Sequence, residues 1–182
     1  MGDLELWKMV RQGDKVAFEE LYHRYYSLLF NYALRLKFDS EEIKDCLQEV
    51  FVRIYMKRSE LPEISSVKSY LYRCLINALL NKTKGFKSKT ISLDELNDFS
   101  IDDSGIEKLF EKNDAELARL QLLKEGFKQL SSKQKHILYL RFIHELSWDE
   151  LAQMFEMSSH SCMNLVGRAI TKLRTVVNIL YD

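Results

Sequence analysis

Proline occurs once in this chain of 182 residues, as Pro62. Because proline removes a helical hydrogen bond and clashes with the preceding turn, its near absence permits long helices through most of the sequence. Apolar residues recur three or four positions apart, which is the spacing of a helix with one buried face. No segment of the sequence alternates apolar and polar residues as a half-buried strand does. The sequence therefore predicts an all-α fold.

Short polar residues mark where several of these helices begin, because they can accept hydrogen bonds from the unpaired N–H groups of a first turn. Such residues precede five apolar-periodic runs, at Asp14, Asp39, Ser131 or Ser132, Ser147 and Ser158. Glu150 follows Ser147 at the spacing of a capping box. Further periodic runs over about 4–10, 66–82 and 115–130 predict additional helices.

The charge pattern divides the chain into two parts. Residues 81–89 contain four Lys and no acid, and residues 91–114 contain eight acids against two Lys. Apolar periodicity weakens there, as is typical of a linker. We therefore expect two small helical domains, 1–84 and 116–182, joined by a flexible linker over 85–115.

Motifs of catalysis and metal binding are absent from the sequence. It has no glycine-rich phosphate loop, its four His lack metal-ligand spacing, and its three Cys lie far apart. We expect no catalytic residue, no metal and no cofactor, and we interpret Cys46, Cys74 and Cys162 as reduced, buried side chains. With no signal peptide and no apolar run of about 18 residues, the sequence predicts a cytoplasmic protein.

Residues 146–169, "LSWDELAQMFEMSSHSCMNLVGRA", have the layout of a helix-turn-helix. In that motif the start of the second helix meets base edges, and Asn164 could pair with adenine through two hydrogen bonds. An ordinary helical hairpin in a core is the alternative. Segment 158–167 holds no Lys or Arg, and the whole chain balances 27 basic against 27 acidic residues. This neutrality argues against a protein that holds DNA alone.

The helix expected after Asp39 has a charged outward face. Its members are Glu42, Asp45, Gln48, Glu49 and Arg53. Such a face is either an ordinary solvated surface or a docking surface for a basic protein partner.

Four segments, in this order, resemble conserved helices of bacterial RNA polymerase sigma factors of the extracytoplasmic-function (ECF) class. They read "GDKVAFEELYHRYYSLLFNYALRL", "DCLQEVFVRIY", "SYLYRCLINALLNK" and "LSSKQKHILYLRFIHELSWDELAQMFEMSSHSCMNLVGRAITKLR". The resemblance implies a subunit that binds core RNA polymerase, at its β′ clamp and β flap, and directs promoter-specific initiation. Domain 1–84 would correspond to sigma region 2 and domain 116–182 to region 4. It further implies promoter DNA and an anti-sigma factor as partners, and no small-molecule substrate.

The resemblance also implies roles for individual residues. Those at the polymerase contact would be Asp45, Gln48, Glu49 and Arg53. Those at the minus-ten element, where a flipped base is held, would be Arg58, Ser59, Glu63, Ser65, Ser66, Tyr70 and Asn77. Those at the minus-thirty-five element would be His160, Ser161, Met163, Asn164, Arg168 and Lys172.

The chain departs from the family pattern at several of these places. Ser161-Cys162 replaces the usual Thr-Val, Tyr70 replaces a Trp, and Gly167 replaces a larger side chain. These departures leave the promoter sequence open. A stand-alone helix-turn-helix regulator is the alternative function, and an enzyme or a purely structural helical protein is the third. A sigma factor shares DNA binding with the polymerase, so its own net charge can be zero.

Overall fold

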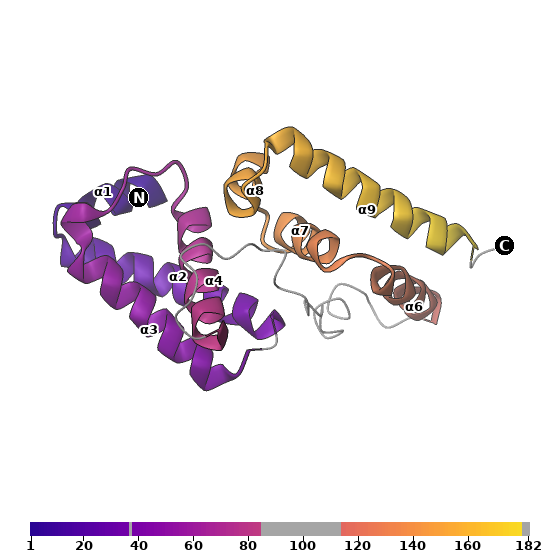
Figure 1. Cartoon of the computed structure of the whole chain (residues 1–182), viewed down its shortest axis with the longest axis horizontal. Helices are drawn as coiled ribbons and strands as arrows, with labels where there is room; N and C mark the ends of the chain where they lie inside the picture. The colour runs from indigo at the N-terminus through magenta and orange to yellow at the C-terminus, as the bar shows by residue number, and fades with distance from the viewer. Residues whose placement is uncertain (37, 85–113, 180–182) are drawn as a thin grey trace. The chain divides into compact units, whose positions relative to one another are not determined.

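The computed structural model describes residues 1–36, 38–84 and 114–179 (Figure 1). The chain separates into two units, Met1–Ile91 and Ser92–Asp182. Every regular element among the described residues is helical, which confirms the all-α prediction. The linker expected over 85–115 lies outside the described residues except at its last two positions, so its boundaries stay a prediction.

Unit 1 is built around one long helix. Its elements are α1 (Asp3–Arg11), α2 (Lys15–Arg35), α3 (Ser40–Met56), the single 3₁₀ turn η1 (Arg58–Glu60) and α4 (Val67–Lys84) (Figure 1). Helices α1, α3 and α4 all contact α2. Leu29, Leu47 and Leu75 are among the fully buried side chains between them. Burial of each such side chain stabilises the fold by roughly 1.5–3 kcal/mol.

Local sequence fixes the turns between these helices. Gly13 lies between α1 and α2 and has a φ of +96°, a backbone conformation that residues other than glycine rarely adopt. Asp14 then accepts a hydrogen bond from the Ala17 N–H at 3.0 Å, and Asp39 accepts one from the Glu41 N–H at 2.8 Å. Both predicted caps are confirmed.

Unit 2 is arranged in the same manner around its last helix. It comprises α6 (Asp114–Lys128), α7 (Ser132–Phe142), α8 (Trp148–Phe155) and α9 (Ser159–Ile179), and the first three pack on α9. Ser131, rather than Ser132, caps α7 in a capping box with Gln134. Ser147 caps α8 with Glu150 as predicted. Ile137, Leu140 and Ala169 are fully buried in the core of this unit.

The prediction that all three cysteines are buried is wrong for Cys74. Cys74 is partly exposed, whereas Cys46 and Cys162 are buried, and all three are free thiols. Leu28 has the apolar spacing of the buried side of α2 but is 41% exposed. Phe18, Tyr22 and Tyr55 are only half-buried. The apolar stripe of α2 is therefore wider than the surface of α2 that the neighbouring helices cover. None of the described helices is long and apolar enough to cross a membrane.

His136 lies in the core of unit 2. Its side chain is 1% exposed, and its ring packs edge-on against Phe155 with centroids 5.5 Å apart. Burial, together with the nearby His144, lowers the pKa of His136 from 6.5 to about 3. The folded unit therefore holds this imidazole neutral under conditions in which the unfolded chain would protonate it.

This arrangement predicts that unit 2 loses stability in acid. Between pH 6.5 and about 3 the unfolded state binds a proton at His136 that the folded state does not. The free energy of unfolding should therefore fall with decreasing pH, by at most about 1.4 kcal/mol per pH unit. Urea unfolding followed by NMR of α7 and α8 amides measures this dependence.

Two variants check the assignment. His136→Met should flatten the pH dependence, because it removes the titrating group and keeps an apolar side chain of similar size. His160→Gln, at an exposed position of the same unit, should leave it unchanged. If the free energy of unfolding of the His136→Met protein depended on pH as steeply as that of the parent, another group would be responsible.

Candidate partner and nucleic-acid interfaces

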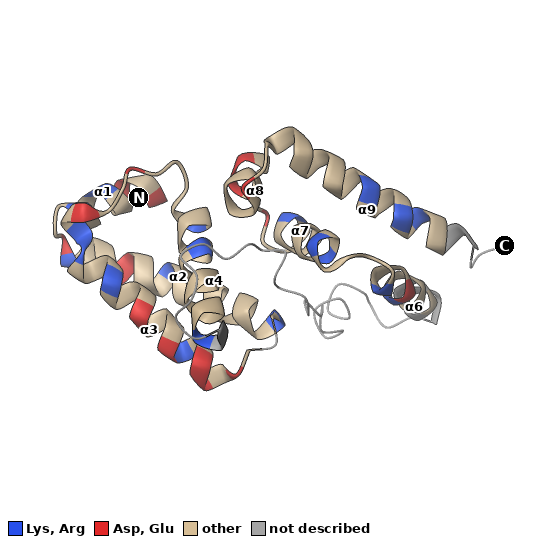
Figure 2. Cartoon of the chain, in the orientation of Figure 1, with Lys and Arg blue, Asp and Glu red and all other residues tan. Residues whose placement is uncertain are grey.

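The predicted outward face of α3 is exposed except at Glu42, which is half-buried. Asp45, Gln48, Glu49 and Arg53 are all exposed. Figure 2 shows the acidic residues of this helix gathered toward its beginning, and none lies after Glu49. Arg53 donates a hydrogen bond to Glu49, one helical turn away, at 3.1 Å. Exposed pairs of this kind contribute little to stability, so both side chains remain available to a partner.

Asp45 also links α3 to α4. Its carboxylate accepts a hydrogen bond from the Lys82 ammonium at 2.9 Å, and this bond is the main reason that the pKa of Lys82 is raised. The Asp45 side chain is nevertheless 70% exposed. Asp45 therefore orients the end of α4 and at the same time presents a carboxylate on the α3 face.

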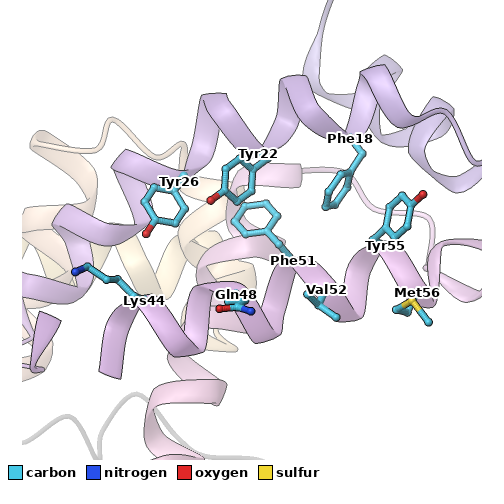
Figure 3. A pocket seen from close by; sticks show the side chains of 9 residues that line it. All are labelled: Phe18, Tyr22, Tyr26, Lys44, Gln48, Phe51, Val52, Tyr55 and Met56. Carbon is cyan, nitrogen blue, oxygen red and sulfur yellow. The ribbon is translucent and has the colours of Figure 1, made fainter. Parts of the chain in front are cut away.

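A groove of about 500 Å³ lies beside this face, between α2 and α3 (Figure 3). Its lining, called the aromatic groove below, is Phe18, Tyr22, Tyr26, Lys44, Gln48, Phe51, Val52, Tyr55 and Met56. The rings pack on one another, with Tyr22 and Phe51 centroids 5.0 Å apart in a T-shaped arrangement. Gln48 belongs both to the groove and to the predicted contact face, so the two surfaces are continuous.

The groove was not predicted from the sequence, because its aromatic residues have the same apolar spacing as residues of a buried helix face. Val52 and Met56 are 52% and 70% exposed. They are four residues apart, so they share one side of α3. Large apolar side chains that gather on a surface indicate a partner site. The signal available in the sequence was that these two residues lie outside the buried stripe of α3.

The loop after η1 is anchored at both ends. Leu61 and Val67 are 7% and 1% exposed, and Glu63 and Ser65 between them are exposed. Ser66 precedes the first residue of α4 and caps it, since its hydroxyl accepts a hydrogen bond from the Ser69 N–H at 3.1 Å. The predicted minus-ten residues Glu63, Ser65 and Ser66 are thus brought together on one short loop.

Arg58 and Ser59 occupy η1, ahead of that loop. The Arg58 guanidinium donates to the Tyr55 carbonyl at 2.7 Å and lies 4.9 Å from the centre of the Tyr55 ring. The Arg58 guanidinium therefore already has partners within unit 1. Ser59 is exposed.

Helix α4 carries the remaining minus-ten candidates. It holds four basic residues and no acidic one. Tyr70 and Asn77 lie on one side of it, and the exposed Arg73, which sequence reasoning did not select, lies between them at helical spacing. Burial raises the pKa of Tyr70 to about 12, so its phenol stays neutral. The Tyr70 ring packs edge-on against Trp7, with centroids 5.0 Å apart, and is therefore a fixed surface rather than a mobile one.

The helix-turn-helix forms from α8 and α9. Glu156 ends α8 in a left-handed conformation, and Ser158 then accepts a hydrogen bond from the Ser161 N–H at 3.1 Å. His160, Met163 and Asn164 are exposed, as predicted. Ser161 is half-buried and accepts a hydrogen bond from the Ser158 hydroxyl at 2.9 Å.

Helical spacing alone would place Ser159 on the outward side of α9, but it is half-buried, and its hydroxyl donates to Asp149 on α8 at 2.7 Å. Ser159 therefore holds the two helices together. Lys172, predicted at the minus-thirty-five element, donates a hydrogen bond to the Gln129 carbonyl between α6 and α7. The Lys172 ammonium thus holds α9 against the segment between α6 and α7, and an external phosphate would have to compete with this contact.

The basic residues of α9 lie from its middle onward (Figure 2). They are Arg168, Lys172 and Arg174, and α9 contains no acid. The start of α9 thus offers neutral polar groups suited to base edges, and the rest offers cations suited to phosphates. No group of three His, Cys, Asp or Glu placed to hold a metal ion occurs in the described part of the chain.

Gly167 lies on the same exposed side of α9. A Cβ built at this position would meet nothing within 4 Å. Gly126 of α6 is different, because a Cβ there would lie 2.9 Å from Leu173 Cδ2. The first glycine is therefore not required by packing within unit 2, whereas the second allows α6 and α9 to approach.

These two glycines predict different effects of the same substitution. Gly167→Ala should raise the free energy of unfolding of unit 2 by about 0.5–1 kcal/mol, because alanine is favoured in a helix interior. Gly126→Ala should raise it less, because the end of the Leu173 side chain must move to make room for the new Cβ. Urea unfolding of both variants tests the pair. A loss of stability in Gly167→Ala would mean that its surroundings are not open.

Both units are similar to parts of known proteins. Residues 21–85 match the family model of sigma-70 region 2, and residues 120–173 match that of sigma-70, region 4. The chain is 28% identical to the RNA polymerase sigma-E factor of Streptomyces avermitilis over 162 residues, which is 89% of this chain and 86% of that protein. It is 26% identical to the RNA polymerase sigma factor YlaC of Bacillus subtilis, over 87% of this chain and 90% of that one.

Solved structures share the fold. CnrH, in complex with the cytosolic domain of CnrY, matches with a TM-score of 0.61 and 19% identity over 97% of each chain. The sigma factor RpoE of Bartonella quintana, in complex with the anti-sigma factor NepR, matches with a TM-score of 0.54 and 14% identity, over 89% of this chain and 97% of that one.

Proposed function

Because this chain belongs to the ECF class of RNA polymerase sigma factors, we propose that its two units divide the work of initiation between them. The chain binds core RNA polymerase and directs promoter-specific transcription initiation. Unit 1 docks on the polymerase and takes the minus-ten element, and unit 2 takes the minus-thirty-five element. We place the domain boundaries at 1–84 and 116–182, and the site of action in the cytoplasm.

The polymerase contact is proposed on α3, at Asp45, Gln48, Glu49 and Arg53, facing the β′ clamp. The observation that carries this is the junction, at Gln48, of an exposed acidic face with the aromatic groove. An interface of that composition has an apolar centre and a charged rim, which is how specific protein surfaces are generally built. Unit 2 would contact the β flap.

The contact predicts that a charge placed in the groove weakens polymerase binding. Val52→Asp should reduce the affinity for core RNA polymerase by about tenfold or more, because it buries an unpaired carboxylate at an apolar centre. Val16→Asp is the matched control, since Val16 is 74% exposed on α2 and does not line the groove. Fluorescence anisotropy of labelled full-length chain with core enzyme measures both.

Two further variants separate the contact from the fold. Gln48→Ala should also weaken binding, whereas Lys82→Gln, which removes only the partner of Asp45 within the chain, should not. Equal affinities for the parent, Val52→Asp and Gln48→Ala proteins would move the contact away from α3.

The minus-ten contact is proposed at the η1–α4 loop and along α4. Glu63, Ser65 and Ser66 on the loop, with Tyr70 and Asn77 on α4, would surround an unstacked base. Arg58 and Ser59 lie at the entry to the loop. A pocket for the base offsets part of the free energy needed to open the duplex. The basic character of α4, including Arg73, supports the approach of a phosphate backbone.

The minus-thirty-five contact is proposed at the start of α9. His160, Ser161, Met163 and Asn164 would meet base edges, and Arg168 and Lys172 would meet phosphates. Ser158 caps the start of α9 and so presents these side chains on a rigid backbone, which supports the proposed contact. Because most cations of a DNA interface are missing here, tight promoter binding requires the polymerase.

These roles predict that base-contacting and phosphate-contacting residues affect promoter binding differently. In the holoenzyme, Asn164→Ala should weaken promoter binding by about tenfold and relax specificity at one base pair. Arg168→Ala should weaken binding to all duplexes similarly and reduce the salt dependence by about one counterion. Titrations of the holoenzyme at several salt concentrations, on promoter variants, distinguish the two. Loss of sequence preference in Arg168→Ala alone would reverse the assignment.

An anti-sigma factor is proposed as the regulator. The similar sigma factor RpoE binds one, NepR, and this supports the same kind of partner here. The α3 face and the aromatic groove are the surfaces on which such a partner would compete with the polymerase. A stand-alone DNA-binding regulator would need neither surface.

A further inference from the structure

Helix α1 lies ahead of the residues that match sigma-70 region 2, yet it contacts the loop proposed to hold minus-ten DNA. The Trp7 indole N–H donates to the Pro62 carbonyl at 3.1 Å. Trp7 is 2% exposed, whereas Pro62 is exposed. A buried side chain of α1 therefore holds the backbone of a surface loop.

A second residue of α1 reaches the same loop. The Arg11 guanidinium donates to the Glu63 carboxylate at 3.4 Å. Glu63 is 90% exposed, and Arg11 is 30% exposed with its Nε buried. Arg11 is thus held against unit 1 while one of its terminal nitrogens meets the exposed part of the loop.

Helix α1 is itself fixed to the long helix of unit 1. Asp3 accepts hydrogen bonds from Arg24 and from the Tyr25 hydroxyl, both on α2. The Trp7 ring also packs against Tyr70 of α4, with centroids 5.0 Å apart. The loop is therefore connected through α1 to both α2 and α4, in addition to its buried ends at Leu61 and Val67.

We propose that α1 is a positioning element, in which Trp7 and Arg11 hold the 61–66 loop in one conformation so that it is ready to receive an unstacked base. The inference rests on the proposed role of this loop at the minus-ten element. A loop that orders only on binding loses conformational entropy at that moment, and a loop already held does not. The positioning role does not require Trp7 or Arg11 to touch the DNA.

A purely packing role for Trp7 makes a different prediction. Packing needs the ring to be buried, but it does not need the N–H to meet the Pro62 carbonyl. Trp7→Phe keeps an aromatic ring and removes the donor, so it separates the two roles. Trp148→Phe is the matched control, because Trp148 lies in unit 2, where it packs with Arg141.

The first measurement is hydrogen exchange of the full-length chain. Trp7→Phe should speed exchange of the hydrogen-bonded amides at the two ends of the loop, those of Leu61, Ser69 and Tyr70, by about fivefold. That factor corresponds to the net contribution of one neutral hydrogen bond, about 1 kcal/mol. Exchange in the centres of α2 and α3 should change less. Arg11→Gln should speed the same loop amides without removing a core side chain. Unchanged loop exchange in both variants would overturn the proposal.

The second measurement is capture of single-stranded DNA by the holoenzyme. The probe is the sequence that the parent holoenzyme selects from single strands with a randomised ten-nucleotide segment. Trp7→Phe should weaken capture by about fivefold, as the loop must now be ordered on binding, with unchanged affinity for core polymerase. The Trp148→Phe holoenzyme should capture the strand like the parent.

The outcomes separate this inference from the proposed function. Asn77→Ala and Ser65→Ala test whether the loop and α4 bind the strand at all. If they weaken capture and Trp7→Phe does not, despite faster loop exchange, the positioning role is wrong and the minus-ten assignment stands. If none of the three weakens capture, the minus-ten assignment itself is wrong.

Discussion

Each unit depends on the burial of one long helix under shorter ones. Helix α2 is covered by α1, α3 and α4, and α9 by α6, α7 and α8. Each unit has fewer than 100 residues and therefore few apolar side chains with which to form a core. Most of these side chains have to pack against the central helix. This leaves the other sides of α3, α4 and α9 free of packing demands. The candidate interfaces lie on those sides.

Charge is distributed by element rather than by an overall excess. Four acids lie on α3, while α4 and α9 carry basic residues and no acid. A chain with no net charge can therefore present an acidic surface to a protein and basic surfaces to phosphates. The division agrees with a subunit that meets DNA only as part of a larger enzyme.

Several polar residues have both an internal and an external role. Asp45 pairs with Lys82, Arg58 with the Tyr55 carbonyl, and Lys172 with the Gln129 carbonyl. From sequence, each was simply an exposed charge at a family position. Spacing along one helix cannot reveal a distant partner, so the bonds of Asp45 to Lys82, of Lys172 to the Gln129 carbonyl and of Ser159 to Asp149 could not be predicted. The bond of Arg58 to the Tyr55 carbonyl is local, but apolar spacing and capping patterns do not specify it.

The sequence by itself determined the helices, because apolar spacing, capping residues and Gly13 act over only a few positions. It also determined which side of α3 and of the start of α9 faces outward. Only the tertiary structure decided that half-buried rings of α2 and α3 form the aromatic groove, and that Trp7 reaches Pro62, 55 positions along the chain. Such contacts depend on how far each neighbour covers a helix, a quantity set by the packing of whole helices and not by any local pattern.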